Sequence, residues 1–426
     1  MMTVIGIVLF FLGILASVAW HELGHFTTAR WFGIKVPEFF VGFGKTVWSR
    51  KVGDTEFGLK AIPLGGYVRM IGMIPPEKGG TLGRSRRTGP FQGLIDDVRK
   101  QSALDVLPED VDRQFWMRAP WKRVIVMIAG PLMNLILAVV LFAIVLMGFG
   151  VPTLTTTVSS VSACVVSAAA PTQDCPPGAP PTPAAAADFR PGDRIVAFNG
   201  QPFDDWDELR MAIRAASGTV TVTVDRGGQQ LELRPTLITT ELNDLDDPKK
   251  IVTGSFLGLA PLSVVTRQDL PAVAGEIGDV IGRTWQAVIN LPQRVPEVFG
   301  SVFLGQERQQ DSPVGIVGAS RIGGEILALD APVGQEIAFF LQLLALVNIS
   351  LFLFNLLPIP PLDGGQIFPA IWESIRRRFA KVRGRPDPGP VDVARLMPVA
   401  YVVALVFVAW SGLLFIADIV NPVTLQ

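Results

Sequence analysis

Residues 4–25 read VIGIVLFFLGILASVAWHELGH, an apolar run that ends in two histidines and a glutamate. The part from Val4 to Trp20 contains no charged residue, and a helix needs about 20 such residues to cross the hydrocarbon core of a bilayer. The run has no basic residues before it and no small-x-small cleavage site after it, which argues against a removable signal peptide. We therefore predict a retained membrane helix with ionisable groups at its end.

Three further apolar runs have a similar length, at Val124–Phe149, Ile337–Leu357 and Val399–Val420. The chain is 49% hydrophobic and 18% charged, with a formal charge of −1. This composition is typical of a membrane protein, and it offers no basic surface for nucleic acid. We predict a polytopic α-helical membrane protein with four transmembrane helices.

His21 and His25 are the only two histidines of the chain. Four residues apart on a helix, they would lie on one face and could bind one zinc ion, while Glu22 acts on a water molecule at the metal. The H-E-x-x-H pattern is that of zinc peptidases. The alternative is that the histidines only pack at a helix end, but ionisable groups beside a membrane helix are costly to bury and indicate function.

A catalytic zinc ion usually has three protein ligands, so one ligand remains to be found. Residues 355–365 read NLLPIPPLDGG, in which Asp363 stands among residues that break helices and let the backbone approach closely. The Lys- and Arg-rich loops predict that the first and third runs end at the same, cytoplasmic face. We predict that Asp363 is the third ligand; the alternative is an aspartate in a simple Pro/Gly turn.

A small α/β domain is predicted in the outer segment that follows the second run. Residues 188–200 read DFRPGDRIVAFNG, a turn, a strand and a tight hairpin turn, and an amphipathic helix and two more strands follow up to residue 237. The Pro-Gly-Asp-Arg-Ile and Asn-Gly elements resemble those of a PDZ domain, which binds extended peptides at a sheet edge; the alternative is a lid that only blocks access. Cys164 and Cys175 lie in this segment, where a disulfide is expected over two free thiols.

Together these motifs resemble the bacterial site-2 protease family of intramembrane zinc metalloproteases. The resemblance rests on the histidine motif, the string Asn-x-x-Pro-x-Pro-x-Leu-Asp-Gly-Gly and the PDZ-like domain between the second and third runs. Further matches are Gly65-Gly66-Tyr67-Val68, Arg123 and the string AGPLMN at residues 129–134. Some relatives carry two PDZ-like units where we find one, and the family suggests no role for the polar insertion at residues 75–112.

Residue by residue, the resemblance implies zinc ligands at His21, His25 and Asp363, a general base and acid at Glu22, and contacts to extended substrate backbone at Asn355, Gly65, Gly66 and Asn134. It implies one zinc ion per chain. The implied substrate is a single-span membrane protein, such as an anti-sigma factor, that is cut within or near its transmembrane segment after a first cut elsewhere. The lipid bilayer and a peptide at the PDZ groove are the other expected partners.

The alternatives are a membrane zinc peptidase of another class, which would take its third ligand from a downstream glutamate, and a non-enzymatic PDZ membrane adaptor, which would tolerate loss of Glu22. We expect a multi-pass protein of the plasma or inner membrane, with both termini and the PDZ-like domain outside the cytoplasm. The expected segments are a first membrane helix (1–25), a cytoplasmic or re-entrant loop with β-hairpins (26–120), a second helix (121–150), the PDZ-like domain (151–268), interfacial helices (269–335), a third helix with the aspartate (336–365), a basic cytoplasmic loop (366–395) and a fourth helix (396–426).

Overall fold

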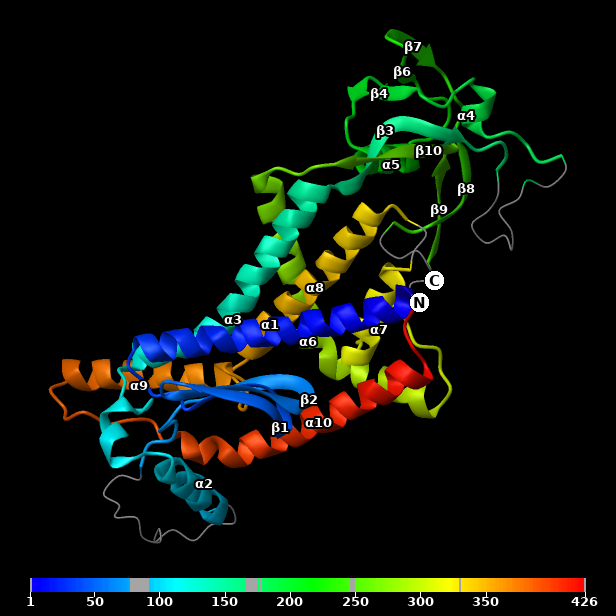
Figure 1. The fold of residues 1–426 in the computed structure, drawn as a ribbon. Helices are drawn as coiled ribbons and strands as arrows, with labels where there is room; N and C mark the ends of the chain where they lie inside the picture. The colour runs from blue at the N-terminus through cyan, green and yellow to red at the C-terminus, as the bar shows by residue number, and fades with distance from the viewer. Residues whose placement is uncertain are drawn as a thin grey trace. The chain divides into compact units, whose positions relative to one another are not determined.

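The computed structural model describes residues 2–76, 92–165, 175, 178–245, 250–328 and 331–424. The chain divides into two compact units, a larger one of residues 1–149 and 269–426 and a smaller one of residues 150–268. Figure 1 shows the helical character of the first and the strands of the second. The smaller unit is a β-rich middle part of the chain, inserted between the two segments of the larger unit.

Four helices in the described part of the chain are long and apolar enough to cross a membrane. They are α1 (Met2–Trp31), α3 (Pro120–Ala143) continued by the π-helical η2 (Ile144–Phe149), α8 (Val333–Leu356), and α10 (Met397–Val420) preceded by the 3-10 turn η3 (Val393–Leu396). Only 11% of the most apolar stretch of the last one is buried. Its apolar side chains therefore face outward, as they must in a helix surrounded by lipid.

The first helix differs from the expected one, because α1 does not end at the histidine motif but continues to Trp31. His21 and His25 consequently lie inside a continuous helix. The segment after it forms two antiparallel strands, β1 (Glu38–Val52) and β2 (Thr55–Arg69), where we expected several short hairpins. Their register is irregular, since residues 38–41 pair both with residues 56–59 and with residues 66–69.

Five further helical elements complete the larger unit: α2 (Gln92–Leu104), the 3-10 helix η1 (Pro108–Arg113), α6 (Leu270–Phe303), α7 (Ile316–Ile326) and α9 (Gly364–Val382). The polar insertion expected at residues 75–112 thus contains a helix, and its residues 77–91 lie outside the described ranges. A salt bridge from Lys35 to the buried Asp110 ties the loop to the connection between α1 and β1.

The smaller unit is built on a six-stranded sheet of order β10-β3-β4-β6-β7, with β5 paired to β4, and a separate β8-β9 pair. Its elements are β3 (Val151–Val161), α4 (Pro183–Ala186), β4 (Arg194–Phe198), β5 (Gln201–Pro202), α5 (Trp206–Ala215), β6 (Val222–Arg226), β7 (Gln229–Leu233), β8 (Ile238–Asn243), β9 (Ile251–Phe256) and β10 (Leu259–Thr266). Asn199 and Gly200 both have positive φ, 48° and 80°, as the tight turn between β4 and β5 requires.

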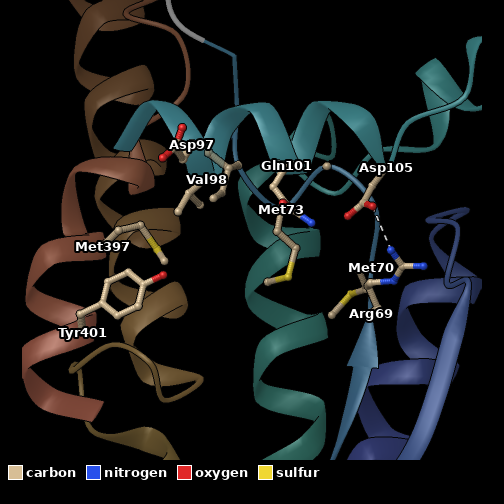
Figure 2. Close-up of a pocket in the computed structure, with 12 residues that line it drawn as sticks. Arg69, Met70, Met73, Asp97, Val98, Gln101, Asp105, Met397 and Tyr401 are labelled. Carbon is tan, nitrogen blue, oxygen red and sulfur yellow. Dashed lines mark hydrogen bonds and ion pairs between the residues drawn. The ribbon is translucent and has the colours of Figure 1, made fainter. Parts of the chain in front are cut away.

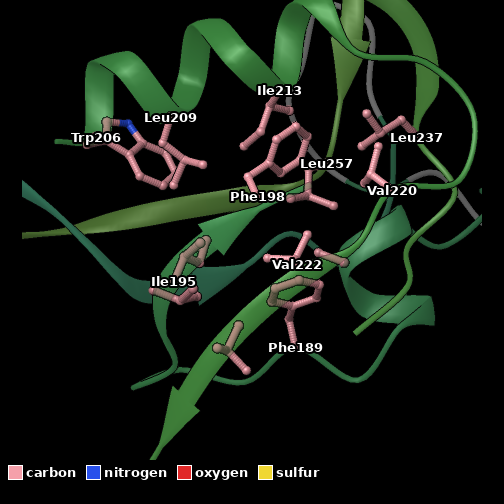
Figure 3. Close-up of a cluster of buried hydrophobic side chains, with 13 residues drawn as sticks. Phe189, Ile195, Phe198, Trp206, Leu209, Ile213, Val220, Val222, Leu237 and Leu257 are labelled. Atoms are coloured by element: carbon pink, nitrogen blue, oxygen red, sulfur yellow. The ribbon is translucent and has the colours of Figure 1, made fainter. Parts of the chain in front are cut away.

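One hydrophobic core holds the smaller unit together (Figure 3). Leu209 and Ile213 of α5 pack with Ile195 of β4 and Val222 of β6, and all four are buried. This agrees with the expected amphipathic helix, whose apolar face covers the sheet. A disulfide joins Cys164 to Cys175 in the same unit.

Candidate metal centre

Helix α1 presents the two histidines to one point. Their Nε2 atoms are 3.1 Å apart, and both side chains are buried, with 8% of His21 and 4% of His25 exposed. The spacing of four residues on a continuous helix gives this arrangement directly.

Asp363 reaches the same point from the turn between α8 and α9. Its Oδ2 atom lies 3.2 Å from Nε2 of His21 and 3.3 Å from Nε2 of His25. Two glycines follow it, and a Cβ on Gly364 would lie only 2.6 Å from the carbonyl carbon of Leu357. The Asp-Gly-Gly sequence therefore allows a turn too tight for any side chain after the aspartate.

These three side chains fit a zinc ion. Ligand atoms that bind zinc at 2.0–2.1 Å in tetrahedral geometry are roughly 3.3 Å from one another, and the three observed separations are 3.1, 3.2 and 3.3 Å. The Nδ1 atom of His25 lies 2.7 Å from the carbonyl oxygen of Val126. With Nδ1 as the donor in this bond, Nε2 keeps its lone pair for a metal.

Glu22 lies beside the ligand cluster and contacts β2. A Cβ on Gly66 would lie 3.2 Å from Cγ of Glu22 and 3.0 Å from the carbonyl oxygen of Phe40. The strand thus passes directly over the acid, and the lack of a side chain at Gly66 makes this approach possible.

Helix α3 supports the cluster from another side, a contribution that the sequence analysis did not identify. A Cβ on Gly130 would lie 2.6 Å from Cε1 and 2.7 Å from Cδ2 of the His25 ring, and one on Gly24 would lie 2.7 Å from the carbonyl carbon of Ala129. The two helices can come this close because both positions are glycines. Small residues in the string at 129–134 were the available signal.

A buried ion pair joins α3 to α9, the helix that begins after Asp363. Arg123 is 2.5 Å from Glu373, whose side chain is fully buried. Glu373 also forms a salt bridge of 2.9 Å with Arg377 and accepts a hydrogen bond of 3.0 Å from the backbone N–H of Val391. The pair fixes the aspartate's helix on the helix that packs against His25. Nothing in the sequence singled out Glu373 as the partner of Arg123.

The remaining predicted site residues are placed as follows. Asn355 donates a hydrogen bond of 2.9 Å to the carbonyl oxygen of Leu351 on its own helix. Asn134 of α3 is completely buried, and neither of its amide atoms has a hydrogen-bond partner among the described residues. Gly65 has a φ of 111°, in the region that favours glycine. The two cysteines belong to the smaller unit and not to the larger unit that holds the metal centre.

Comparison with known proteins gives consistent matches over the chain. The model of a family described as Peptidase family M50 matches residues 9–387. The chain is 35% identical to the zinc metalloprotease Rip1 of Mycobacterium tuberculosis, with all of both chains covered. It is 30% identical to the metalloprotease MmpA of Caulobacter vibrioides, over 95% of this chain and 94% of that one.

Proposed function

Because the chain belongs to peptidase family M50 and is a zinc metalloprotease of the membrane, we propose that it hydrolyses peptide bonds within or near the transmembrane segment of single-span membrane proteins. The observation that carries this proposal is the cluster of His21, His25 and Asp363, which is held among helices long and apolar enough to span a bilayer. Ionisable groups are costly to bury in a membrane, so their presence there indicates a function.

His21, His25 and Asp363 are the zinc ligands in this proposal, with one ion per chain. A bound zinc ion supplies Lewis acidity, which polarises the scissile carbonyl and favours attack by water at neutral pH. Glu22 takes the proton of the attacking water and then returns it to the leaving amine as the peptide bond breaks. Its position next to the ligands and against Gly66 of β2 supports this role.

The substrate backbone must be extended at the cleavage site, because a helix hides its amides in its own hydrogen bonds. Residues 66–69 of β2 pair with residues 38–41 on one side, and no described strand pairs with them on the other. An extended substrate can add to that edge beside Glu22. Gly65 and Gly66 permit the approach, and Asn355 and Asn134 contribute amide groups from α8 and α3.

The biological setting proposed here follows the family resemblance. The substrate class is a single-span protein such as an anti-sigma factor, already trimmed on its outer side, whose cytoplasmic fragment is released by the second cut. The PDZ-like unit, residues 151–268, and both termini lie outside the cytoplasm, and the loops at 26–120 and 366–395 lie inside, as the distribution of Lys and Arg favours. The edge of the sheet in the PDZ-like unit offers a site for a peptide.

The test is cleavage of a single-span reporter in liposomes, with the cut bond located by mass spectrometry. We expect cleavage inside or next to the reporter's membrane segment by the wild type, and none by Glu22→Gln. Glu336→Gln, which replaces a glutamate in the first turn of α8, is the matched control and should cleave normally. Cleavage by Glu22→Gln, or cuts confined to soluble parts of the reporter, would overturn the proposal.

A further inference from the structure

A cavity of about 500 Å³ lies in the larger unit, between α2, the segment after β2 and the start of α10. Figure 2 shows α2 along one side, with Met397 and Tyr401 of α10 at one end and Arg69 and Asp105 at the other. The metal centre uses none of the residues that line it.

The cavity combines an apolar lining with polar groups that are free to bind. Met70, Met73 and Met397 line it with flexible thioether side chains, which adapt to the shape of an alkyl chain. Gln101 of α2 points into the space beside Met73 (Figure 2). Among the described residues, no donor pairs with Asp97, which lies on the same helix and also lines the cavity.

The charge of the lining is acidic. Among the described residues that line it, Arg69 is the only cation, and this guanidinium is already held by two carboxylates, Glu38 at 2.7 Å and Asp105 at 2.9 Å. Asp97 is left without a cationic partner in the described part of the chain. A cavity with apolar walls and an unpaired carboxylate is complementary to a side chain that has an alkyl stem and a positive end, as Lys and Arg have.

The position of the cavity relates it to the substrate. Gly66 lies against Glu22, and Arg69, three residues further along β2, lines the cavity. Since a strand rises about 3.3 Å per residue, this separation is roughly 10 Å. An extended substrate paired with this edge therefore brings a residue two to four positions from its scissile bond to the cavity.

The cavity lies at the C-terminal end of β2, and this end of the strand is close to the C-terminal end of α1. The backbone N–H of Ile71 donates to the carbonyl oxygen of Lys35, four residues after α1 ends at Trp31. The distribution of basic residues places this end of α1 at the cytoplasmic face. Single-span proteins carry an excess of Lys and Arg on the same side of the membrane.

We propose that this cavity binds a Lys or Arg side chain from the cytoplasmic flank of the substrate, two to four residues from the scissile bond. The proposal rests on the proposed function, and it adds a reason for selecting substrates by the charge next to their membrane segment. The alkyl stem lies along the methionines, and the charged end faces Asp97. The insertion that contains α2 thereby gains a role in substrate choice.

The test compares three reporters with one membrane segment, which carry Lys, Gln or Glu at the flanking positions. The wild type should cleave the Lys reporter about three- to tenfold more efficiently than the Glu reporter, measured as kcat/KM. Asp97→Asn should reduce this preference and Asp97→Lys should reverse it, with normal zinc content as evidence of folding. Glu109→Lys, a charge reversal at an exposed acid that does not line the cavity, should keep the wild-type preference.

Equal cleavage of the three reporters by the wild type, or a preference for Lys that Asp97→Lys leaves unchanged, would overturn the role of the cavity and leave the proposed function intact. If the wild type cleaves none of the reporters, the proposed function itself fails, and this inference fails with it. The Gln reporter separates the two cases, because its cleavage requires only the metal centre and the strand edge.

Discussion

Replacement of Gly130 by alanine tests whether close packing of α3 on α1 sets the geometry of the metal centre. The new Cβ would lie 2.6 Å from Cε1 and 2.7 Å from Cδ2 of His25, whereas carbon atoms in contact are normally about 3.5–4.0 Å apart. The imidazole would have to retreat by roughly 1 Å, or the helices would have to separate by a similar amount. Either movement disturbs ligand atoms that now lie 3.1–3.3 Å from one another.

A displacement of this size has a large expected effect. Misplacement of a reacting group by 1 Å can lower activity by about 100-fold, and disturbed support of a metal ligand commonly weakens metal binding by about 10- to 100-fold. Overpacking at a buried contact costs a further 1–3 kcal/mol of stability, approximately. We therefore expect Gly130→Ala to bind zinc at least tenfold more weakly and to cleave its reporter at about 1% of the wild-type rate.

The assay is a competition titration of zinc against a chelator of known affinity, followed by reporter cleavage at saturating zinc. Gly148→Ala is the matched control, because it lies in the same helical run and a Cβ there meets nothing within 4 Å. Wild-type zinc affinity and cleavage in Gly130→Ala would refute the argument from packing. Equal losses in both variants would show that the effect is not specific to the contact with His25.

Three further predictions concern the supporting structure. Arg123→Gln removes one of the two cations that pair with the buried carboxylate of Glu373, while Arg377 remains, and should destabilise the protein by about 1–3 kcal/mol. The measurement is thermal unfolding in detergent. Arg123→Lys should recover part of this loss, and a wild-type melting temperature in the Gln variant would contradict the prediction. Hydrogen bonds from Arg226 at 2.7 and 2.9 Å lower the pKa of Asp193 in the smaller unit, so their stabilisation is complete above the ordinary pKa and lost as the pH falls through the lowered one. Between about pH 7 and pH 3, the free energy of unfolding should fall less in Arg226→Gln than in the wild type. Parallel curves for the two proteins would contradict this prediction. Removal of zinc by a chelator should abolish cleavage and lower the melting temperature, with zinc restoring both; cleavage that persists without zinc would count against the metal centre.

The sequence was sufficient to predict the four apolar helices and the meeting of Asp363 with the histidines. The helices follow from long apolar runs, which are a local signal. The meeting of Asp363 with the histidines follows from the ligand number of zinc together with the expected topology of the spans. The end of α1 was not predicted, because ionisable residues lower the apolar character of a run without ending a helix. The helix continues through the motif to Trp31.

The supporting contacts could not be predicted, because they depend on residues far apart in the sequence. Glu373 is one acidic residue in a basic segment until α9 packs on α3 and places it against Arg123. The cavity beside α2 likewise combines residues from three separate segments of the chain. Gly130 was visible as a small residue in a membrane helix, but its contact with the His25 ring appears only in the packed structure.

The central claim is that His21, His25 and Asp363 bind one zinc ion on which Glu22 depends for catalysis. The most direct measurement is bound zinc per chain in the purified wild type, Asp363→Asn and Glu22→Gln, together with reporter cleavage by each. We predict one zinc ion in the wild type, weakened zinc binding in Asp363→Asn, and full zinc without cleavage in Glu22→Gln. Zinc binding unaffected by Asp363→Asn, or normal cleavage by Glu22→Gln, would contradict this account.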